Sequence, residues 1–124
     1  MLRLFYARNL TGPWIEHPKS PIVRCDCHKA RPGGRVLLVH GRVIRFAQDD
    51  CQAYGRSVRA FEVLELTPEN YLEREVPESP ILEPSGSGWN ADGMHNLDAH
   101  PLGNNTWIAC VDGYRRSIVF GLKY

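Results

Sequence analysis

Proline and glycine interrupt this chain every few residues, and that punctuation limits the secondary structure it can form. The sequence contains 9 Pro and 11 Gly among 124 residues, and helical signals are weak throughout. The runs between these breaks are rich in Val, Ile, Leu, Tyr and Phe, which favour short antiparallel strands. The sequence therefore predicts an all-β chain.

Two of these runs face each other across a two-residue turn. The runs "RVLLV" (35–39) and "RVIRFA" (42–47) flank His40 and Gly41, so we predict a tight hairpin in which Gly41 takes a positive φ. The run "SVRAFEVLEL" (57–66) alternates only in part between apolar and polar residues. That pattern indicates a strand whose two faces are both partly covered.

The segment after residue 66 contains fewer strand signals. Thr67 can begin a helix of one turn at most, because Pro68 would occupy the first helical position. Pro, Ser and Gly dominate residues 77–89, which predicts a loop. Two short strands around an Asn-rich turn follow, and "SIVFGLKY" (117–124) is predicted to end the chain as another strand.

The length of the chain predicts a single domain, 1–124. Within this domain the strand-like runs form a repeat. The middle unit (31–76) contains four runs, at 31–39, 42–48, 57–66 and 71–76. The C-terminal unit (94–124) contains three runs, and the N-terminal unit (1–23) contains two. A four-stranded repeat of about 40 to 50 residues is typical of β-propeller blades. We therefore expect antiparallel, propeller-blade-like sheets, with one full blade and two partial ones.

Partial blades leave unpaired strand edges at the two ends of the chain, in "LRLFYAR" and in "SIVFGLKY". Such edges either close on each other within one chain, as a barrel or sandwich, or pair between chains. We expect a homodimer.

The charge balance and the lack of a long apolar stretch argue against two classes of partner. Lys and Arg number 15 and Asp and Glu number 14, so no broad positive field is present to hold a phosphate backbone. No stretch approaches the roughly 20 apolar residues that span a bilayer, and Arg3 and Arg8 interrupt the segment that a signal peptide would keep apolar. We expect no nucleic acid and no membrane as partner, and a cytoplasmic location.

The four cysteines, Cys25, Cys27, Cys51 and Cys110, permit a disulfide or a zinc site. In "CDCH" one intervening residue points the two thiols to opposite faces of an extended chain, and the other two cysteines supply no second ligand pair with recognised spacing. We therefore expect reduced, mostly buried thiols, and no metal or other cofactor.

Several segments resemble known propellers. The stretch "LFYARNLTGPWIEHPKSPI" resembles a blade ending of five-bladed propellers related to family 43 glycoside hydrolases. In this order, "ARPGG", "GRVIRFAQD", "FEVLELTPENYLE" and "GMHNLD" are similar to the C-terminal blades of the propeller domain in glucosamine inositolphosphorylceramide transferase and its bacterial relatives. The resemblance covers nearly all of the chain and implies a carbohydrate-active relative.

Polar side chains stand at the ends of the predicted strands. Arg31 opens the first strand of the middle unit, and His95 opens the first strand of the next unit. The innermost strand of a propeller blade faces the central channel, so both side chains are predicted to point toward one axis. Gln48 and Asp49 can orient hydrogen bonds of a polyol, and Tyr54 can stack on a sugar ring. We expect these five residues to bind a ligand.

Each of these residues also has a structural alternative. Arg31 can satisfy loop carbonyls or pair with Asp49, and Asp49 can bond the backbone of its own turn. Tyr54 can be a core residue and His95 a structural histidine.

Glu62 lies among apolar neighbours, where an ionised carboxylate is costly unless it is paired, for instance with Arg45 on the adjacent strand. A glycosidase uses two carboxyl groups roughly 5 to 10 Å apart. Glu62 and Asp49 are the only candidates for such a pair of carboxyl groups. We expect them not to act as one, because Glu62 need not face the central channel of a propeller.

The resemblance implies a truncated relative, because a full propeller of this kind needs about five blades. Its glycosidase relatives spread their carboxylates over several blades, so no complete catalytic set is expected here. We predict a non-catalytic chain with a polar patch for a carbohydrate or sugar phosphate. The alternatives are a hydrolase or transferase whose site is assembled across subunits, and an interaction module without a small ligand.

Overall fold

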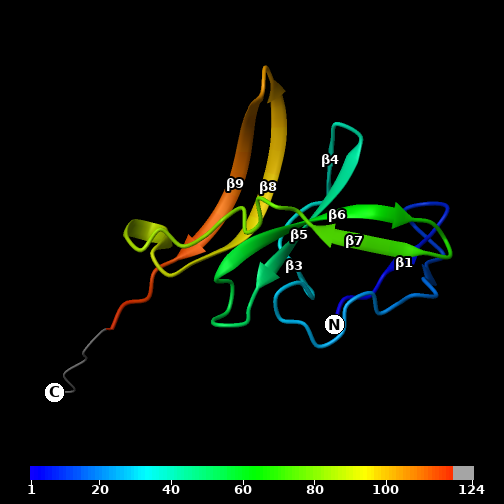
Figure 1. Cartoon of the computed structure of the whole chain (residues 1–124), viewed down its shortest axis with the longest axis horizontal. Helices are drawn as coiled ribbons and strands as arrows, with labels where there is room; N and C mark the ends of the chain where they lie inside the picture. The colour runs from blue at the N-terminus through cyan, green and yellow to red at the C-terminus, as the bar shows by residue number, and fades with distance from the viewer. Residues whose placement is uncertain (119–124) are drawn as a thin grey trace.

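The computed structural model describes residues 1–118. These residues contain nine strands and one 3₁₀ turn. The elements are β1 (Phe5–Tyr6), β2 (Ile15–Glu16), β3 (Arg31–Pro32), β4 (Leu37–Val39), β5 (Arg42–Asp49), β6 (Ser57–Leu66), β7 (Tyr71–Glu75), η1 (Gly88–Asn90), β8 (Gly93–Gly103) and β9 (Thr106–Tyr114). Every pairing between these strands is antiparallel (Figure 1). The prediction of an all-β fold with antiparallel sheets is confirmed.

The middle sheet has the order β3-β5-β6-β7, and β4 also pairs with β5. Its strands follow the four predicted runs closely, except that the first run is broken into β3 and β4. The break occurs where the backbone approaches β8: Leu97 donates its amide hydrogen to the Gly33 carbonyl at 2.8 Å, and Gly34 forms a parallel bridge with Leu97. The glycines thus join two sheets at the cost of an interruption in one strand.

The β4–β5 and β8–β9 hairpins each turn through two residues in the left-handed region. His40 has φ 49° and Gly41 has φ 78°, which confirms the predicted positive φ at Gly41. Asn104 and Asn105, with φ 49° and 58°, make the corresponding turn between β8 and β9. Positive φ at both central positions gives the turn whose twist matches that of the flanking strands.

The segment after β6 agrees with the prediction of one helical turn at most, whereas the predicted last strand differs at the residues that are described. No helix begins at Thr67; its Oγ1 accepts hydrogen bonds from the amides of Glu69 and Asn70, and this bonding makes the turn from β6 to β7. Residues 117 and 118 lie outside any strand, and the rest of the predicted last strand lies outside the described residues. Within residues 1–118 no helix is long and apolar enough to cross a membrane.

The core lies where the middle sheet meets the foot of the β8–β9 hairpin. Its buried members are Phe46, Val58, Ala60, Leu97 and Ala99. The predicted loop at 77–89 covers part of this core, because the Ile81 amide donates to the Val58 carbonyl and the Val58 amide donates to the Leu82 carbonyl, each at 2.9 Å. Burial of these side chains is the main stabilising term that holds the two sheets together.

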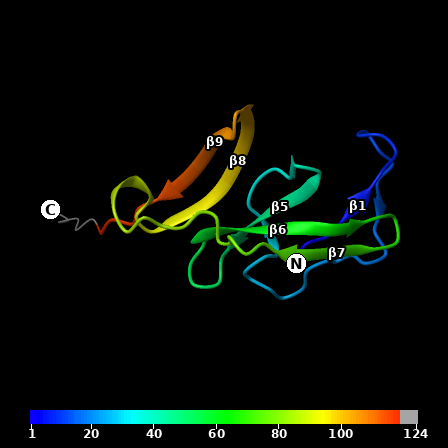
Figure 2. The same ribbon diagram turned by 45° about the horizontal axis from the view of Figure 1, so that its top comes forward.

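The β8–β9 hairpin stands clear of the middle sheet beyond this junction (Figures 1 and 2). From His100 to Cys110 every residue is exposed, including Trp107 and Ile108. The described residues therefore form three separate sheets, none of which closes on itself.

Candidate functional site

The site is built where the β5–β6 loop meets the first residues of β8. The amide of Met94 donates to the Arg56 carbonyl at 3.1 Å, which brings the loop against β8. Gly55, with φ +61°, permits this approach, because a Cβ atom there would lie 2.5 Å from the Cβ of His95. His95 therefore packs directly on the loop that carries Tyr54.

Arg31, Tyr54 and His95 contact one another in series at this junction, here called the Arg31 cluster. The Cζ atom of Arg31 lies 4.6 Å from the centroid of the Tyr54 ring, within the range of a cation–π contact. The centroids of the Tyr54 and His95 rings are 5.5 Å apart, with an angle of 70° between their planes. The structure thus brings together a guanidinium and an imidazole that are 64 positions apart in the chain.

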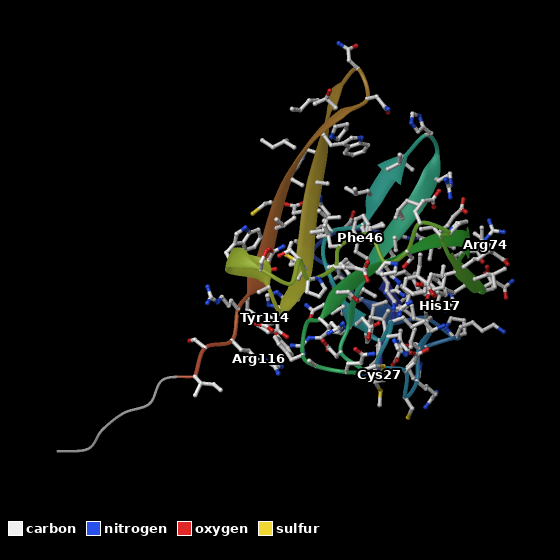
Figure 3. All side chains as sticks on the ribbon, turned by 60° about the vertical axis from the view of Figure 1, so that its left-hand side comes forward. His17, Cys27, Phe46, Arg74, Tyr114 and Arg116 are labelled. Atoms are coloured by element: carbon white, nitrogen blue, oxygen red, sulfur yellow. A yellow bond between two sulfur atoms is a disulfide. The ribbon has the colours of Figure 1, made fainter. Side chains whose placement is uncertain are left out.

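Two residues of β9 support the cluster, and the sequence reasoning missed both. The Tyr114 hydroxyl donates to the Tyr54 carbonyl at 2.8 Å, and its ring contacts His95 edge to face at 6.5 Å. Figure 3 shows Tyr114 at the foot of β9. Asp112 Oδ1 lies 2.8 Å from His95 Nδ1 without hydrogen-bonding alignment. The strand register places Tyr114 opposite Gly93 and Asp112 opposite Asn96, and this register is known only from the folded chain.

Gln48 lies beside the cluster, because it is the register partner of Arg31 across β3 and β5. Its side-chain oxygen is buried and has no hydrogen-bond partner within residues 1–118. A buried acceptor without a donor is costly, and this oxygen is covered by protein in the described residues.

Asp49 does not join the Arg31 cluster. Its carboxylate accepts hydrogen bonds from His28 Nδ1 at 2.8 Å, Arg59 Nε at 2.7 Å and the Cys51 amide at 3.1 Å. Burial raises the pKa of Asp49, but these three donors outweigh it and hold the pKa below its usual value. Asp49 thus organises a turn, which was its structural alternative. Successive side chains of a strand point to opposite faces, so the Asp49 side chain lies on the face opposite to that of Gln48.

Arg31 has one further neighbour, Asp50. Its carboxylate lies 3.4 Å from Arg31 Nη1, a distance longer than that of a strong charged pair. Arg31 Nη2 donates to the Tyr54 hydroxyl at 3.5 Å, which is also long, and the side chain of Arg31 is 51% exposed. The cluster therefore presents a guanidinium that is only loosely held by protein.

The prediction of reduced, mostly buried cysteines is wrong. Cys27 and Cys51 form a disulfide, and Cys25 and Cys110 are free and exposed. The pair is separated by 24 residues, and its loops are brought together by a hydrogen bond from the Asp50 amide to the Cys27 carbonyl at 2.9 Å. No local spacing rule identifies such a pair, because the contact depends on how two loops meet.

Glu62 is paired with arginine, but Arg45, the partner suggested from the sequence, is not the arginine that it binds. Arg45 binds Glu73 on β7 through two hydrogen bonds, at 2.7 and 2.8 Å. Glu62 instead accepts hydrogen bonds from Arg42 and Arg74. The register explains the difference, since Arg45 lies opposite Phe61 and Glu62 lies opposite Ile44, which are on opposite faces of the sheet.

The same register separates the two carboxylates nominated for glycosidase chemistry. Glu62 shares a face with Ile44, whereas Asp49 shares the other face with Arg45. Both carboxylates are engaged by arginines, at 2.7 Å for the nearest nitrogen in each case. Because they lie on opposite faces of the sheet, Glu62 and Asp49 cannot both contact the glycosidic bond of one bound substrate.

Replacing Glu62 with glutamine is expected to weaken the dependence of stability on acid pH. Hydrogen bonds from Arg42 lower the pKa of Glu62 from its ordinary value of 4.5, burial acts against them, and Arg74 lowers it further. A carboxyl whose folded pKa is lowered stabilises the fold above the unfolded pKa and loses that contribution as the pH falls through the folded pKa. Urea unfolding midpoints measured from pH 7 down to about pH 3 should fall less steeply for Glu62→Gln than for the wild type.

The matched control is Glu65→Gln, an exposed position on the same strand for which the described part of the chain contains no ion pair. It should follow the wild-type curve. Equal slopes for the Glu62 variant and the wild type would contradict the role given to the Arg42 pair.

Comparison with known proteins identifies relatives of nearly the whole chain. Residues 1–114 match the family model described as "Glucosamine inositolphosphorylceramide transferase 1, N-terminal". Proteins named glucosamine inositolphosphorylceramide transferase 1 from Oryza sativa subsp. japonica and subsp. indica are each 37% identical over 118 residues, which are 92% of this chain and 16% of theirs. The Arabidopsis thaliana protein of that name is 36% identical over 118 residues, 92% of this chain and 15% of its own length.

The chain thus spans about one sixth of the length of these plant relatives, at 15 to 16%. No solved structure matches it.

Proposed function

Because the chain belongs to the family of the N-terminal domain of glucosamine inositolphosphorylceramide transferase 1, we propose that it has a non-catalytic, carbohydrate-related role in which the Arg31 cluster binds a sugar or sugar phosphate. The family supports the carbohydrate-related part of this proposal. The geometry of the cluster supports the assignment of the ligand to particular residues. The activity in the relatives' name is theirs, and nothing in the Arg31 cluster requires it.

We also propose that the sheets are blades of a five-bladed propeller related to family 43 glycoside hydrolases. The middle sheet supports this, because it has four strand positions in meander order. The parallel bridge between Gly34 and Leu97 supports it further, since it sets the leading segments of two successive units side by side.

The observation that carries the binding proposal is the stack of Arg31 on Tyr54. Tyr54 is 53% exposed, so its ring can contact the apolar face of a sugar, and the adjacent guanidinium offers paired donors to hydroxyl or phosphate oxygens. An open depression of about 400 Å³ lies beside it, lined by Met1, Cys27, Ala30, Arg31, Pro32 and Asp50. An aromatic face and a cation together recognise both parts of a sugar phosphate.

A phosphate group is the stronger partner for this arginine. The present contact with Asp50 is long, at 3.4 Å, whereas a guanidinium binds a phosphate through two parallel hydrogen bonds of normal length. A dianionic phosphate can therefore compete with the single carboxylate. Free sugars cannot form these charged hydrogen bonds with Arg31 and should bind more weakly.

We expect sugar phosphates to raise the melting temperature of the wild type, and Arg31→Ala to weaken their binding at least about tenfold, the loss typical of one charged hydrogen-bonded contact. A thermal-shift screen of glucose 6-phosphate, glucosamine 6-phosphate, the corresponding free sugars and inorganic phosphate identifies the ligand class. Isothermal titration then gives Kd for the wild type, Arg31→Ala and Arg31→Lys.

Arg8→Ala, at an exposed position in the N-terminal segment, is the matched control for loss of one positive charge. It should bind as the wild type does. An unchanged ligand response in Arg31→Ala, together with a lower melting temperature, would favour an interaction module whose polar residues only hold loops together.

A homodimer and a cytoplasmic location are further proposals. The exposed outer edge of β9 supports pairing between chains, because unpaired strand edges offer free backbone groups to a partner.

A further inference from the structure

The disulfide lies within a group of side chains that can bind a metal ion. The Sγ atoms of Cys27 and Cys51 and a ring nitrogen of His28 all lie within 4.8 Å of one another. Thiolate sulfur and imidazole nitrogen are the ligands that Zn²⁺ prefers in proteins. We propose that reduction of this disulfide creates a zinc site made of Cys27, His28 and Cys51. The proposal goes beyond the sugar-binding function and does not depend on it.

The orientation of His28 supports this assignment. Its Nδ1 lies 2.8 Å from Asp49 Oδ2, and an ionised carboxylate can only accept, so Nδ1 carries the proton and Nε2 keeps its lone pair. A carboxylate that holds one nitrogen of a metal-binding histidine is the usual outer-shell arrangement at zinc sites. The Asp49 side chain is largely buried and is itself held by Arg59 at 2.7 Å, so it is a rigid support.

The backbone keeps the two cysteines close without help from the sulfur–sulfur bond. The Asp50 amide donates to the Cys27 carbonyl at 2.9 Å, and the Cys51 amide donates to Asp49 Oδ1 at 3.1 Å. Asp49 therefore positions two of the three ligands. When the disulfide opens, these contacts hold both thiols near His28, and a pre-organised site loses less conformational entropy on binding.

The chemistry balances with a dithiol or a phosphine as the reductant. Two electrons and two protons convert the sulfur–sulfur bond into two thiols; a dithiol supplies both and becomes a disulfide, whereas a phosphine supplies the electrons and takes oxygen from water to become its oxide, the water supplying the two protons. Zn²⁺ then replaces the two thiol protons, which pass to solvent, and the three protein ligands leave a fourth position for water. Cys27 is exposed, so the reductant has access to the bond.

Cobalt titration of the full chain tests the proposal. After reduction with a phosphine, Co²⁺ should produce thiolate-to-cobalt absorption in the near ultraviolet and the intense visible bands of a tetrahedral ion, and one equivalent of Zn²⁺ should remove both. The oxidised wild type has the same sequence and is already folded, and it should show neither signal. Absence of both signals from the reduced wild type would overturn the proposal.

Variants identify the ligands. Cys27→Ser and Cys51→Ser should lose most of the thiolate absorption, and His28→Ala should bind at least tenfold more weakly. Asp49→Asn should keep the spectrum while its affinity falls about 10- to 100-fold, the effect expected of an outer-shell carboxylate.

Cys25→Ser and Cys110→Ser are the matched controls, because both thiols are free and exposed. They should leave the spectrum and the affinity unchanged. Thiolate absorption that disappears with either control, or that persists at full strength in Cys27→Ser, would also overturn the proposal. Circular dichroism of each variant separates loss of a ligand from loss of the fold.

Discussion

Gly34→Ala should lower the free energy of unfolding by roughly 3 kcal/mol, since backbone strain at positive φ and overpacking each cost about 1 to 3 kcal/mol. Gly34 has φ +150°, and a Cβ atom there would overlap the carbonyl oxygen of Leu97. The obstructing atoms belong to the backbone of β8, so they cannot turn aside as a side chain would. Relief requires the middle sheet and β8 to separate at the core.

Urea denaturation followed by tryptophan fluorescence measures this loss. Gly41→Ala is the control, because Gly41 also has a positive φ, +78°, but no atom lies within 4 Å of the added Cβ. It should cost about 1 kcal/mol from backbone conformation alone. Equal losses in the two variants would show that the contact between Gly34 and Leu97 does not limit stability.

Removing either partner of the Arg45–Glu73 pair should cost about 3 to 5 kcal/mol, because the remaining charge would be buried without compensation. The two side chains are 9% and 8% exposed. The Tyr71 hydroxyl donates to Glu73 at 2.6 Å, Arg45 donates to the Lys29 carbonyl at 3.2 Å, and the guanidinium lies 4.8 Å from the centroid of the Phe61 ring. The pair thus also binds the Tyr71 hydroxyl and the Lys29 carbonyl and packs on the Phe61 ring.

A double-mutant cycle distinguishes a buried pair from an exposed one. Arg45→Met and Glu73→Leu should each be strongly destabilising, and the double variant should be more stable than either single variant, since it leaves no unpaired charge. Glu16→Gln, which breaks the exposed pair with Arg3, should change stability far less. Single variants as mild as this control would contradict the assignment of Arg45–Glu73 as a buried pair.

Local chemistry predicted the strands and the tight turns well. The runs at 42–48 and 57–66 correspond to β5 and β6, and the left-handed Gly41 lies where the turn residues placed it. These features depend on neighbours within a few positions, where glycine conformation and the spacing of apolar residues are sufficient evidence.

Side-chain pairing across strands was predicted less well. Arg45 was suggested as one partner for Glu62, but one position of register places them on opposite faces. The disulfide was missed for a related reason, because Cys27 and Cys51 lie in loops that meet only in the folded chain. Residue spacing alone contains no information about either contact.

In the candidate site, some of the selected residues lie together and others do not. Arg31, Tyr54 and His95 were selected as polar residues at strand ends, and the fold brings them into one cluster. Asp49 was selected by the same reasoning, yet its carboxylate faces His28 and Arg59 instead. Tyr114 was overlooked, although its hydroxyl and ring fix both Tyr54 and His95.

Composition and short-range pattern were enough to establish the all-β class, the order of most strands and the residues able to carry polar chemistry. Long-range packing alone chose which of those residues meet, because the register between β5 and β6 and the glycine contact at β8 decide the face on which each side chain lies. Burial of the shared core stabilises that arrangement over its alternatives, and burial is a property of the whole folded chain.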